Sequence, residues 1–185
     1  MRLTSILTTG GAAAASVVLL GGPALAQHIT GTPGDDHLRG TYAHDTIHGK
    51  AGNDVIKGLG GPDSLFGQGG DDQLRGGSDS ARDLLDGGRG ADQLIGGPAT
   101  DFFHGGPGAD VVRGGTGNDQ LETIQGRDQI FMGPGNDSLS FLDDDGQRAV
   151  IDCGQGHDVV NYLGEIDPND VIRANCEEVN ANTSD

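Results

Sequence analysis

Apolar residues recur along this chain at a regular interval of nine residues. From Gly31 to Asn161 the sequence divides into fourteen rows, most of them nine residues long, and the eighth position of every row is apolar. These residues are Leu38, Ile47, Ile56, Leu65, Leu74, Leu85, Leu94, Phe103, Val112, Leu121, Ile130, Leu139, Ile151 and Val160. Such a residue and its two neighbours predict a short strand with one side chain pointing inward. We therefore expect a core built from one side chain per row.

The sixth position of the rows is acidic with the same regularity. Thirteen of the fourteen rows carry Asp there: Asp36, Asp45, Asp54, Asp63, Asp72, Asp83, Asp92, Asp101, Asp110, Asp119, Asp128, Asp137 and Asp158. A disordered acidic segment has no reason to hold its carboxylates at one phase of a repeat. The pattern therefore predicts an ordered repeat protein.

Glycine marks the turns between these strands. It occupies the first position of the first ten rows, from Gly31 to Gly114, and the fourth position of most rows. The fourth-position residues are Gly34, Gly52, Gly61, Gly70, Gly90, Gly108, Gly117, Gly126, Gly135 and Gly156. A sharp turn that aims its carbonyl groups at one point needs backbone angles forbidden to residues with a Cβ atom. We expect glycine at both positions because of those angles.

The composition narrows the possible functions. The chain has 185 residues with 35 Gly and 7 Pro, aromatic residues make up 4%, and Trp is absent. Few large side chains are available for a wide core, which argues against an ordinary enzyme domain. Lys and Arg number 11 against 28 Asp and Glu, for a net charge of −17. Such a surface repels nucleic acid and anionic membranes, so cations are the expected partners.

The repeat resembles the RTX (repeats-in-toxin, haemolysin-type) calcium-binding family, whose nonapeptide reads G-G-x-G-x-D-x-U-x. The resemblance covers Gly31 to Asn161 and rests on the agreement of the Gly, Asp and apolar positions. It implies an all-β fold, a parallel β-roll (a right-handed β-helix-like solenoid), in which two rows form one coil. Fourteen rows then give seven coils, and we assign residues 27–161 to the roll.

The resemblance also implies the metal ligands. In the family, each ion lies between two turns and is held by sixth-position carboxylates and main-chain carbonyls of the Gly-rich segment. The corresponding candidates here are Asp36, Asp54, Asp63, Asp72, Asp92, Asp101, Asp110, Asp119, Asp128 and Asp137, with Gly34, Gly52, Gly70, Gly90, Gly108, Gly117, Gly126 and Gly135. Stacked carboxylates repel one another unless a cation lies between them, and flexible all-oxygen coordination favours Ca²⁺ over Mg²⁺. We expect several Ca²⁺ ions, with folding coupled to their binding.

Some rows depart from the pattern. Ala43 and Ala99 replace the fourth Gly, Pro62 follows Gly61, and two additional residues lengthen the turn before Asp83. We expect these departures to weaken their sites. Row thirteen has no sixth-position Asp, which weakens the prediction of a site that includes it.

The two ends of the chain differ from the repeats. Residues 1–26 predict a signal peptide, because a short apolar run follows Arg2 and the sequence Ala24-Leu25-Ala26 precedes Gln27. We expect a mature protein that begins at Gln27, is secreted to the extracellular space and does not insert into a membrane.

The other end, residues 162–185, is expected to be a capping segment with a tail. Asp170 and Ile172 repeat the D-x-U spacing, which suggests a final degenerate coil. Cys153 and Cys176 are the two cysteines, and an even pair in an exported protein predicts a disulfide.

Catalytic motifs are missing from the sequence. His44 and His48 are spaced as on a zinc-binding helix, but the repeat places them in a turn and a strand, where we expect them to face solvent. The leading hypothesis is a secreted, non-enzymatic calcium-binding roll with a structural or interaction role. A β-helical enzyme acting on an extracellular polysaccharide and a surface-associated adhesin are the alternatives. The protein or polysaccharide partner is not indicated by the sequence.

Overall fold

The computed structural model describes residues 25–141, 147–163, 166 and 168–181. The predicted signal peptide therefore lies almost wholly outside the described residues. Every regular element in the described part of the chain is a β-strand, and every pair of neighbouring strands is parallel. None of the described residues forms a helix long and apolar enough to cross a bilayer.

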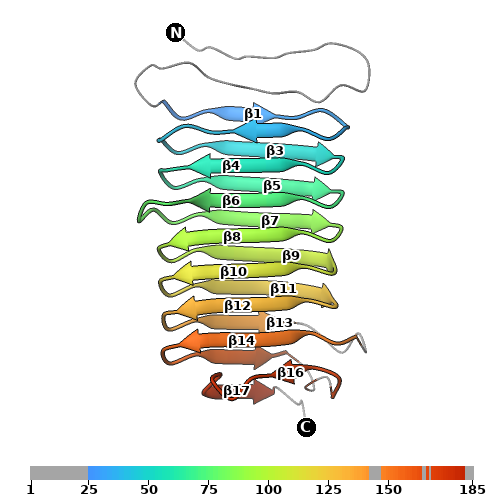
Figure 1. Ribbon diagram of the computed structural model, residues 1–185, viewed down its shortest axis with the longest axis vertical. Coiled ribbons are helices and arrows are strands. Elements are labelled where there is room, and N and C mark those ends of the chain that lie inside the picture. Colours follow the sequence, from blue (N-terminus) through green and yellow to red (C-terminus); the bar gives the residue numbers. More distant parts are fainter. Residues whose placement is uncertain (1–24, 142–146, 164–165, 167, 182–185) are drawn as a thin grey trace.

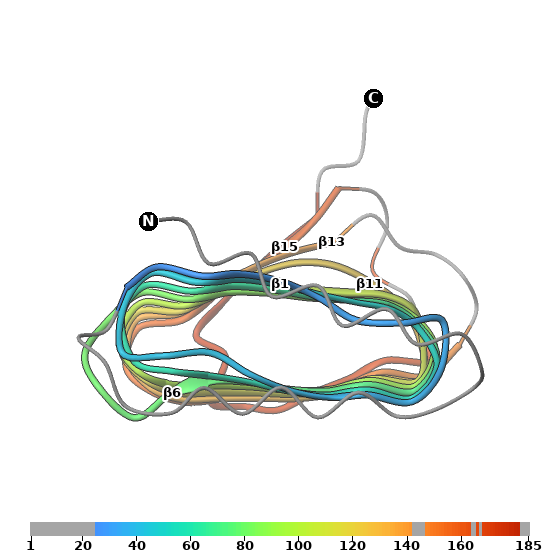
Figure 2. The ribbon, with the colours of Figure 1, turned by 90° about the horizontal axis from the view of Figure 1, so that it is seen from above.

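The chain alternates between two sheets, so that one coil consists of one strand from each (Figure 1). The nine-stranded sheet contains β1 (His28–Thr30), β3 (Thr46–Ala51), β5 (Ser64–Gly69), β7 (Leu84–Arg89), β9 (Phe102–Gly108), β11 (Gln120–Gly126), β13 (Ser138–Phe141), β15 (Val159–Tyr162) and β17 (Glu178–Ala181). The eight-stranded sheet contains β2 (His37–Arg39), β4 (Val55–Leu59), β6 (Gln73–Gly77), β8 (Gln93–Pro98), β10 (Val111–Thr116), β12 (Gln129–Pro134), β14 (Val150–Gln155) and β16 (Val171–Ile172). Seen from above, the coils superimpose as a flattened ring with one sheet on each long side (Figure 2). The predicted parallel β-roll is confirmed.

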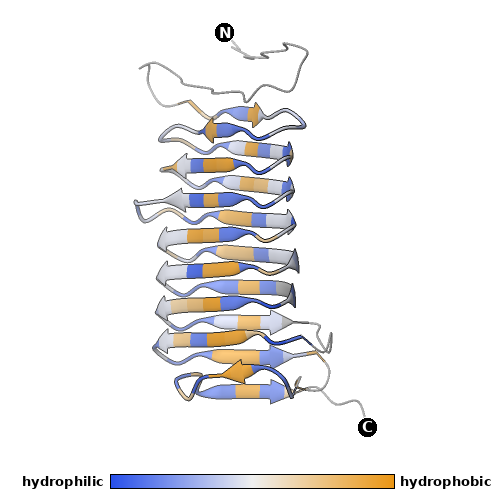
Figure 3. Cartoon of the chain, turned by 45° about the vertical axis from the view of Figure 1, so that its right-hand side comes forward, coloured by the Kyte–Doolittle hydropathy of each residue, from blue (hydrophilic) through white to orange (hydrophobic). Residues whose placement is uncertain are grey.

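The core is a file of apolar side chains within each sheet. Equivalent positions face each other across neighbouring coils, so that Leu38 pairs with Ile56 and Ile56 pairs with Leu74. All fourteen eighth-position residues are buried. The residues on either side of them face outward, and Figure 3 shows the resulting apolar bands running across polar strands. Because side chains alternate along a strand, positions six, eight and one all point inward.

The roll extends beyond the fourteen rows at both ends. Strand β1 precedes the first row and pairs with β3, while β16 and β17 follow the last row and pair with β14 and β15. The expected seven coils therefore become about eight. The degenerate coil predicted from Asp170 and Ile172 is present as β16, and residues 171–181 continue both sheets.

The predicted disulfide is also present. Cys153 in β14 is bonded to Cys176, which lies just before β17, with a Cα–Cα distance of 5.2 Å. Both cysteines are buried at the C-terminal end of the core. The bond therefore ties the last turn of the chain to the coil beneath it.

Candidate metal sites

The regular position of Asp within each row places the carboxylates in two columns, one along each edge of the roll. We define column A as the sixth-position residues that precede the eight-stranded sheet: Asp36, Asp54, Asp72, Asp92, Asp110, Asp128, Ala149 and Asp170. We define column B as those that precede the nine-stranded sheet: Asp45, Asp63, Asp83, Asp101, Asp119, Asp137, Asp158 and Glu177. All thirteen Asp residues of the repeat are at most 3% exposed. Aspartate is rarely buried so completely, and here it happens in every coil.

One oxygen of the carboxylates, Oδ1, links successive coils through hydrogen bonds from the backbone. The backbone N–H of Asp36 donates to Oδ1 of Asp54 over 2.7 Å, and the N–H of Asp54 donates to Oδ1 of Asp72 over 2.7 Å. The same bond recurs along both columns at 2.7 or 2.8 Å. The columns are therefore backbone-to-carboxylate ladders that run parallel to the strand pairing.

The second oxygen has no such partner in most of the carboxylates, whereas Oδ2 of Asp36 accepts the N–H of Thr32 and Oδ2 of Asp45 accepts the N–H of Thr41. In the described part of the chain, nine carboxylates bury their Oδ2 atom without a hydrogen bond: those of Asp54, Asp63, Asp72, Asp92, Asp101, Asp110, Asp119, Asp137 and Asp158. A buried charged oxygen without a partner is costly, and one in almost every turn is far above the usual frequency in folded proteins. Nearly every turn therefore contains a buried carboxylate oxygen that needs a cation or a hydrogen-bond donor as its partner.

The surroundings of these oxygens explain the first-position glycines. A Cβ atom on Gly31 would lie 2.5 Å from Oδ2 of Asp36 and 2.5 Å from the carbonyl oxygen of Gly49 in the next coil. A Cβ atom on Gly40 would meet Asp45 and Gly58 in the same way. In these rows the first-position glycine is therefore required by close approach, and our prediction that it serves the backbone angles was wrong; in later rows the buried residues Met132 and Cys153 occupy the same position.

Positive φ angles occur instead at the fourth and second positions of the turn. Gly52, at a fourth position, has φ +103°. At the second position, Lys50, Leu59 and Gln68 adopt φ of 96°, 91° and 79° although they carry a Cβ atom. The sequence reasoning missed the second position, because in these three rows no glycine marks it.

Burial controls the ionisation of the columns. Removal from water raises the pKa of Asp63, Asp72, Asp83, Asp110 and Asp119 to about 7, and that of Asp54, Asp92 and Asp137 to about 6. For Asp110, the hydrogen bond from the backbone of Asp92 lowers the pKa, while the charges of Asp128 and Asp92 raise it further. At neutral pH the roll thus holds carboxylates that need either a proton or a cation.

The donor set fits a hard, oxygen-seeking cation. Among the described residues, no group of three or more His, Cys, Asp or Glu side chains converges as a metal cluster. A site on these edges must therefore combine carboxylate oxygens with main-chain carbonyls, such as the unpartnered Oδ2 of Asp54 and the carbonyl of Gly67, which both lie beside Gly49. Multidentate oxygen coordination of this kind suits Ca²⁺ better than Mg²⁺.

The predicted ligands divide between the two edges. Column A contains Asp36, Asp54, Asp72, Asp92, Asp110 and Asp128, with the turn glycines Gly34, Gly52, Gly70, Gly90, Gly108 and Gly126. Column B contains Asp63, Asp101, Asp119 and Asp137, with Gly117 and Gly135. The fourth-position glycines stack closely, since a Cβ atom on Gly70 or Gly90 would overlap the carbonyl of the glycine one coil earlier.

The irregular rows keep the same carboxylate geometry. Asp45, Asp63 and Asp101 are buried and hydrogen-bonded in the ladder although Ala43, Pro62 and Ala99 stand in their turns. Asp83 does likewise after its longer turn. These substitutions change the turn and leave the column intact.

Sequence reasoning omitted several members of the columns from the candidate ligands. They are Asp45, Asp83, Asp158, Asp170 and Glu177. Oδ1 of Asp170 accepts the N–H of Ala149 over 2.8 Å, and Oε2 of Glu177 accepts the N–H of Asp158 over 2.9 Å. The signal for Glu177 was its spacing to Val179, which copies the D-x-U pattern with Glu in place of Asp.

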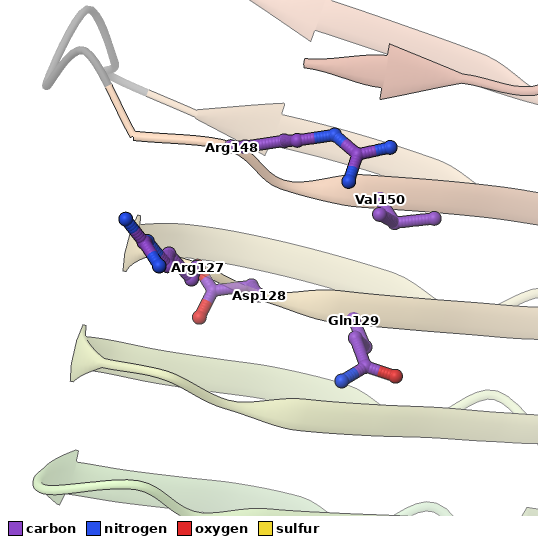
Figure 4. A pocket seen from close by; sticks show the side chains of 5 residues that line it. All are labelled: Arg127, Asp128, Gln129, Arg148 and Val150. Carbon is purple, nitrogen blue, oxygen red and sulfur yellow. The ribbon is translucent and has the colours of Figure 1, made fainter. Parts of the chain in front are cut away.

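Column A is interrupted in row thirteen. Ala149 takes the place of the Asp and is buried, while Arg127 and Arg148 lie on successive coils of this edge. Together with Asp128, Gln129 and Val150 they line a hollow (Figure 4). This step has one carboxylate fewer than the others and two guanidinium groups beside it, and both features disfavour a divalent cation.

The fold and the two columns define a class: a parallel β-roll with repeated acidic turns. The RTX calcium-binding nonapeptide repeat family matches the chain in four overlapping copies, at residues 30–61, 48–80, 78–112 and 104–139. These copies span more than half of the sequence, and the chain belongs to this family. No curated protein matches the chain.

Proposed function

We propose that this protein binds several Ca²⁺ ions along the two edges of its roll and that binding drives folding. The observation that carries the proposal is the recurrence of a buried, unpartnered Oδ2 atom beside a main-chain carbonyl in successive coils. Without cations, the roll would bury mutually repelling carboxylates around a core only one side chain wide. With Ca²⁺, the same oxygens become ligands.

A binding role accounts for the chain's acids better than catalysis does. The thirteen repeat Asp residues are all buried members of the two ladders, and in the twelve from Asp45 onward Oδ1 accepts a backbone N–H. We propose a non-enzymatic protein in which Ca²⁺ builds a rigid rod with two exposed sheet faces.

We further propose that the roll folds after secretion. The expected signal peptide supports export, and Ca²⁺ sites of the weak extracellular class, with Kd of about 10⁻⁴ to 10⁻³ M, fill outside the cell and stay empty inside. Expression in a secreting host, followed by N-terminal sequencing of the protein in the medium, tests this. A mature start at Gln27 supports the proposal, and retention of the whole protein inside the cell with Met1 intact contradicts it.

Calcium titration of the purified chain, followed by far-ultraviolet circular dichroism, tests the function. We expect a strand signal that appears with Ca²⁺ and is lost with EGTA. Mg²⁺ at equal concentration is the control and should give little response.

One observation favours an interaction role for the face of the eight-stranded sheet. Arg39, Lys57 and Arg75 are exposed and lie in register on β2, β4 and β6, and Arg113 follows two strands later. Within the described residues, none of these four side chains lies within 4.0 Å of a carboxylate. Strands about 4.8 Å apart therefore present a row of cations without carboxylate partners, of which Arg113 also lies 5.5 Å from the ring centroid of Phe131, on a chain of net charge −17.

We propose an acidic extracellular polysaccharide as the partner of this row, because an extended chain of anionic sugars can place successive charges along it. Binding to a carboxylated polysaccharide is compared between the wild type and the triple variant Arg39→Gln, Lys57→Gln, Arg75→Gln. The control is Lys50→Gln, Arg82→Gln, Arg89→Gln, which removes three cations that lie outside this row. Loss of binding in the first variant alone supports the interaction, and equal binding by both variants contradicts it.

A further inference from the structure

We infer that the chain beyond the family-matched repeats forms one more Ca²⁺ site, between Asp158 and Glu177, and that the Cys153–Cys176 disulfide holds this site closed. The inference rests on the proposed function and extends it to residues that follow the last matched repeat, which ends at residue 139. It also assigns a purpose to the disulfide.

Glu177 occupies the position of a repeat Asp. Its Oε2 accepts the N–H of Asp158 over 2.9 Å, as Oδ1 of Asp158 accepts the N–H of Asp137 over 2.8 Å. The backbone continues the same pattern, because Glu178 donates its N–H to the carbonyl of Asp158 over 3.0 Å. The step from Asp158 to Glu177 therefore repeats the hydrogen bonds of the earlier steps of column B, with an acidic side chain that is exposed where the repeat Asp residues are buried.

A separate observation points to a ligand at this step. Oδ2 of Asp158 is buried without a hydrogen-bond partner, and the residue is 0% exposed. The next turn contributes a second buried oxygen without a partner, Oδ1 of Asn175. Carboxylate and amide oxygens are the ligands that Ca²⁺ takes. Both sulfur atoms are bonded to each other, so this step has no thiolate to favour Zn²⁺.

The turn that carries Glu177 needs reinforcement. Arg173 ends the x-U-x triplet of β16, and only four residues, 174–177, lie between it and β17. The repeats have six residues between one triplet and the next. None of the four residues is glycine. Arg173 pairs with Asp152 over 3.1 Å, and Nδ2 of Asn175 donates to Oδ1 of Asp152 over 2.7 Å. The disulfide adds a covalent link between Cys153, the first residue of the Asp158 turn, and Cys176, the neighbour of Glu177. The two walls of the site are thus cross-linked.

Binding and the disulfide are linked by this geometry. An ion that contacts both the Asp158 turn and the Glu177 turn stabilises the arrangement in which the two sulfur atoms are bonded. The disulfide in turn holds the ligands of both turns in place. A dithiol reductant opens the bond by supplying two electrons and two protons, which gives two cysteine thiols and the oxidised reductant. Ca²⁺ should therefore protect the disulfide, and reduction should weaken one Ca²⁺ site.

Glu177→Gln tests the site, with Glu178→Gln as its matched control. Both substitutions remove one negative charge from adjacent residues, and Gln keeps the acceptor for the N–H of Asp158, but Glu178 lies at an outward position of β17. Calorimetric Ca²⁺ titration should show one ion fewer, or one site weakened on the order of tenfold, in Glu177→Gln alone.

The rate of disulfide reduction by dithiothreitol gives a second, local measurement. We expect Ca²⁺ to slow reduction on the order of tenfold in the wild type and in Glu178→Gln, and to slow it much less in Glu177→Gln. Equal stoichiometry and equal protection in the two variants would overturn the inference while leaving Ca²⁺ binding by the repeats intact. Failure of the wild type to bind Ca²⁺ at all would overturn the proposed function itself.

Discussion

The substitution Asp110→Asn separates a metal-ligand role from a structural one, because it should act in opposite directions with and without Ca²⁺. Asp110 is fully buried in the middle of column A, and its Oδ1 accepts the N–H of Asp92 over 2.8 Å. Asn has the same shape and keeps this acceptor. It replaces the unpartnered Oδ2 with an amide nitrogen that cannot bind a cation.

The expected magnitudes follow from the burial of the charge. A rise of the pKa of Asp110 from 3.8 to about 7 corresponds to at most roughly 4 kcal/mol of destabilisation of the metal-free roll at pH 8. Relaxation of the protein around the charge, which gives buried sites an effective dielectric constant of about 20, reduces this to about 2 kcal/mol, which the neutral Asn should recover. With Ca²⁺ present, loss of a ligand should weaken binding at least roughly tenfold, which is about 1.4 kcal/mol per ion affected.

Urea unfolding at saturating Ca²⁺, together with circular dichroism in EGTA at pH 8, measures both effects. Asp71→Asn is the control, because Asp71 is an exposed acid of the same edge whose Oδ1 accepts the N–H of Ala91. We expect Asp110→Asn to lower the Ca²⁺-loaded stability and to increase strand content in EGTA. Equal destabilisation in both conditions would refute the ligand role and leave Asp110 as a hydrogen-bonding residue.

Three further predictions concern protons and glycines. The folded-state pKa values of the columns are raised to about 6 or 7, so the metal-free roll holds protons that the unfolded chain has released. The stability of the metal-free roll should therefore fall as pH rises from about 4 to 7. Circular dichroism in EGTA should show more strand at pH 5 than at pH 8. Loss of structure on acidification in EGTA would contradict this. Gly96→Ala should destabilise the Ca²⁺-loaded roll by about 1 to 3 kcal/mol, because its Cβ atom would lie 2.7 Å from the carbonyl oxygen of Gly114; Gly69→Ala, whose nearest contact is 3.8 Å, is the control, and equal thermal midpoints would refute the close-approach account. Lys50→Gly should stabilise the protein by about 1 kcal/mol, since φ of Lys50 is 96°, and a lower midpoint in urea would show that the Lys side chain outweighs the backbone strain.

The nine-residue period, together with the resemblance to the RTX family, was sufficient to predict the two sheets and their register. A residue such as Ile56 recurs at the same phase as Leu38 and Leu74, and parallel stacking in coils of 18 residues leaves a single arrangement that buries all three. The same period predicted the carboxylate columns, because Asp54 keeps a fixed distance from Ile56 in the chain. The disulfide followed from the number of cysteines and the expected compartment, and the structure confirms it.

The remaining features depend on contacts between coils, which the period does not contain. The first-position glycines are set by the oxygen of an Asp five residues later, as Gly31 is by Asp36. Lys50 adopts a positive φ because the rows above and below impose the turn shape on it. Glu177 has the D-x-U spacing to Val179, but its hydrogen bond to Asp158 across a last turn shorter than nine residues does not follow from the period. Each of these needed the packed structure to be seen.

The most direct test of the account is a calorimetric Ca²⁺ titration of the chain at neutral pH, with circular dichroism recorded on the same samples. We predict that several ions bind, that strand signal rises in proportion to the ions bound, and that EGTA reverses both changes. A full strand spectrum in EGTA that does not change when Ca²⁺ is added, with no heat of binding, would contradict the claim that Ca²⁺ holds the two columns of carboxylates together.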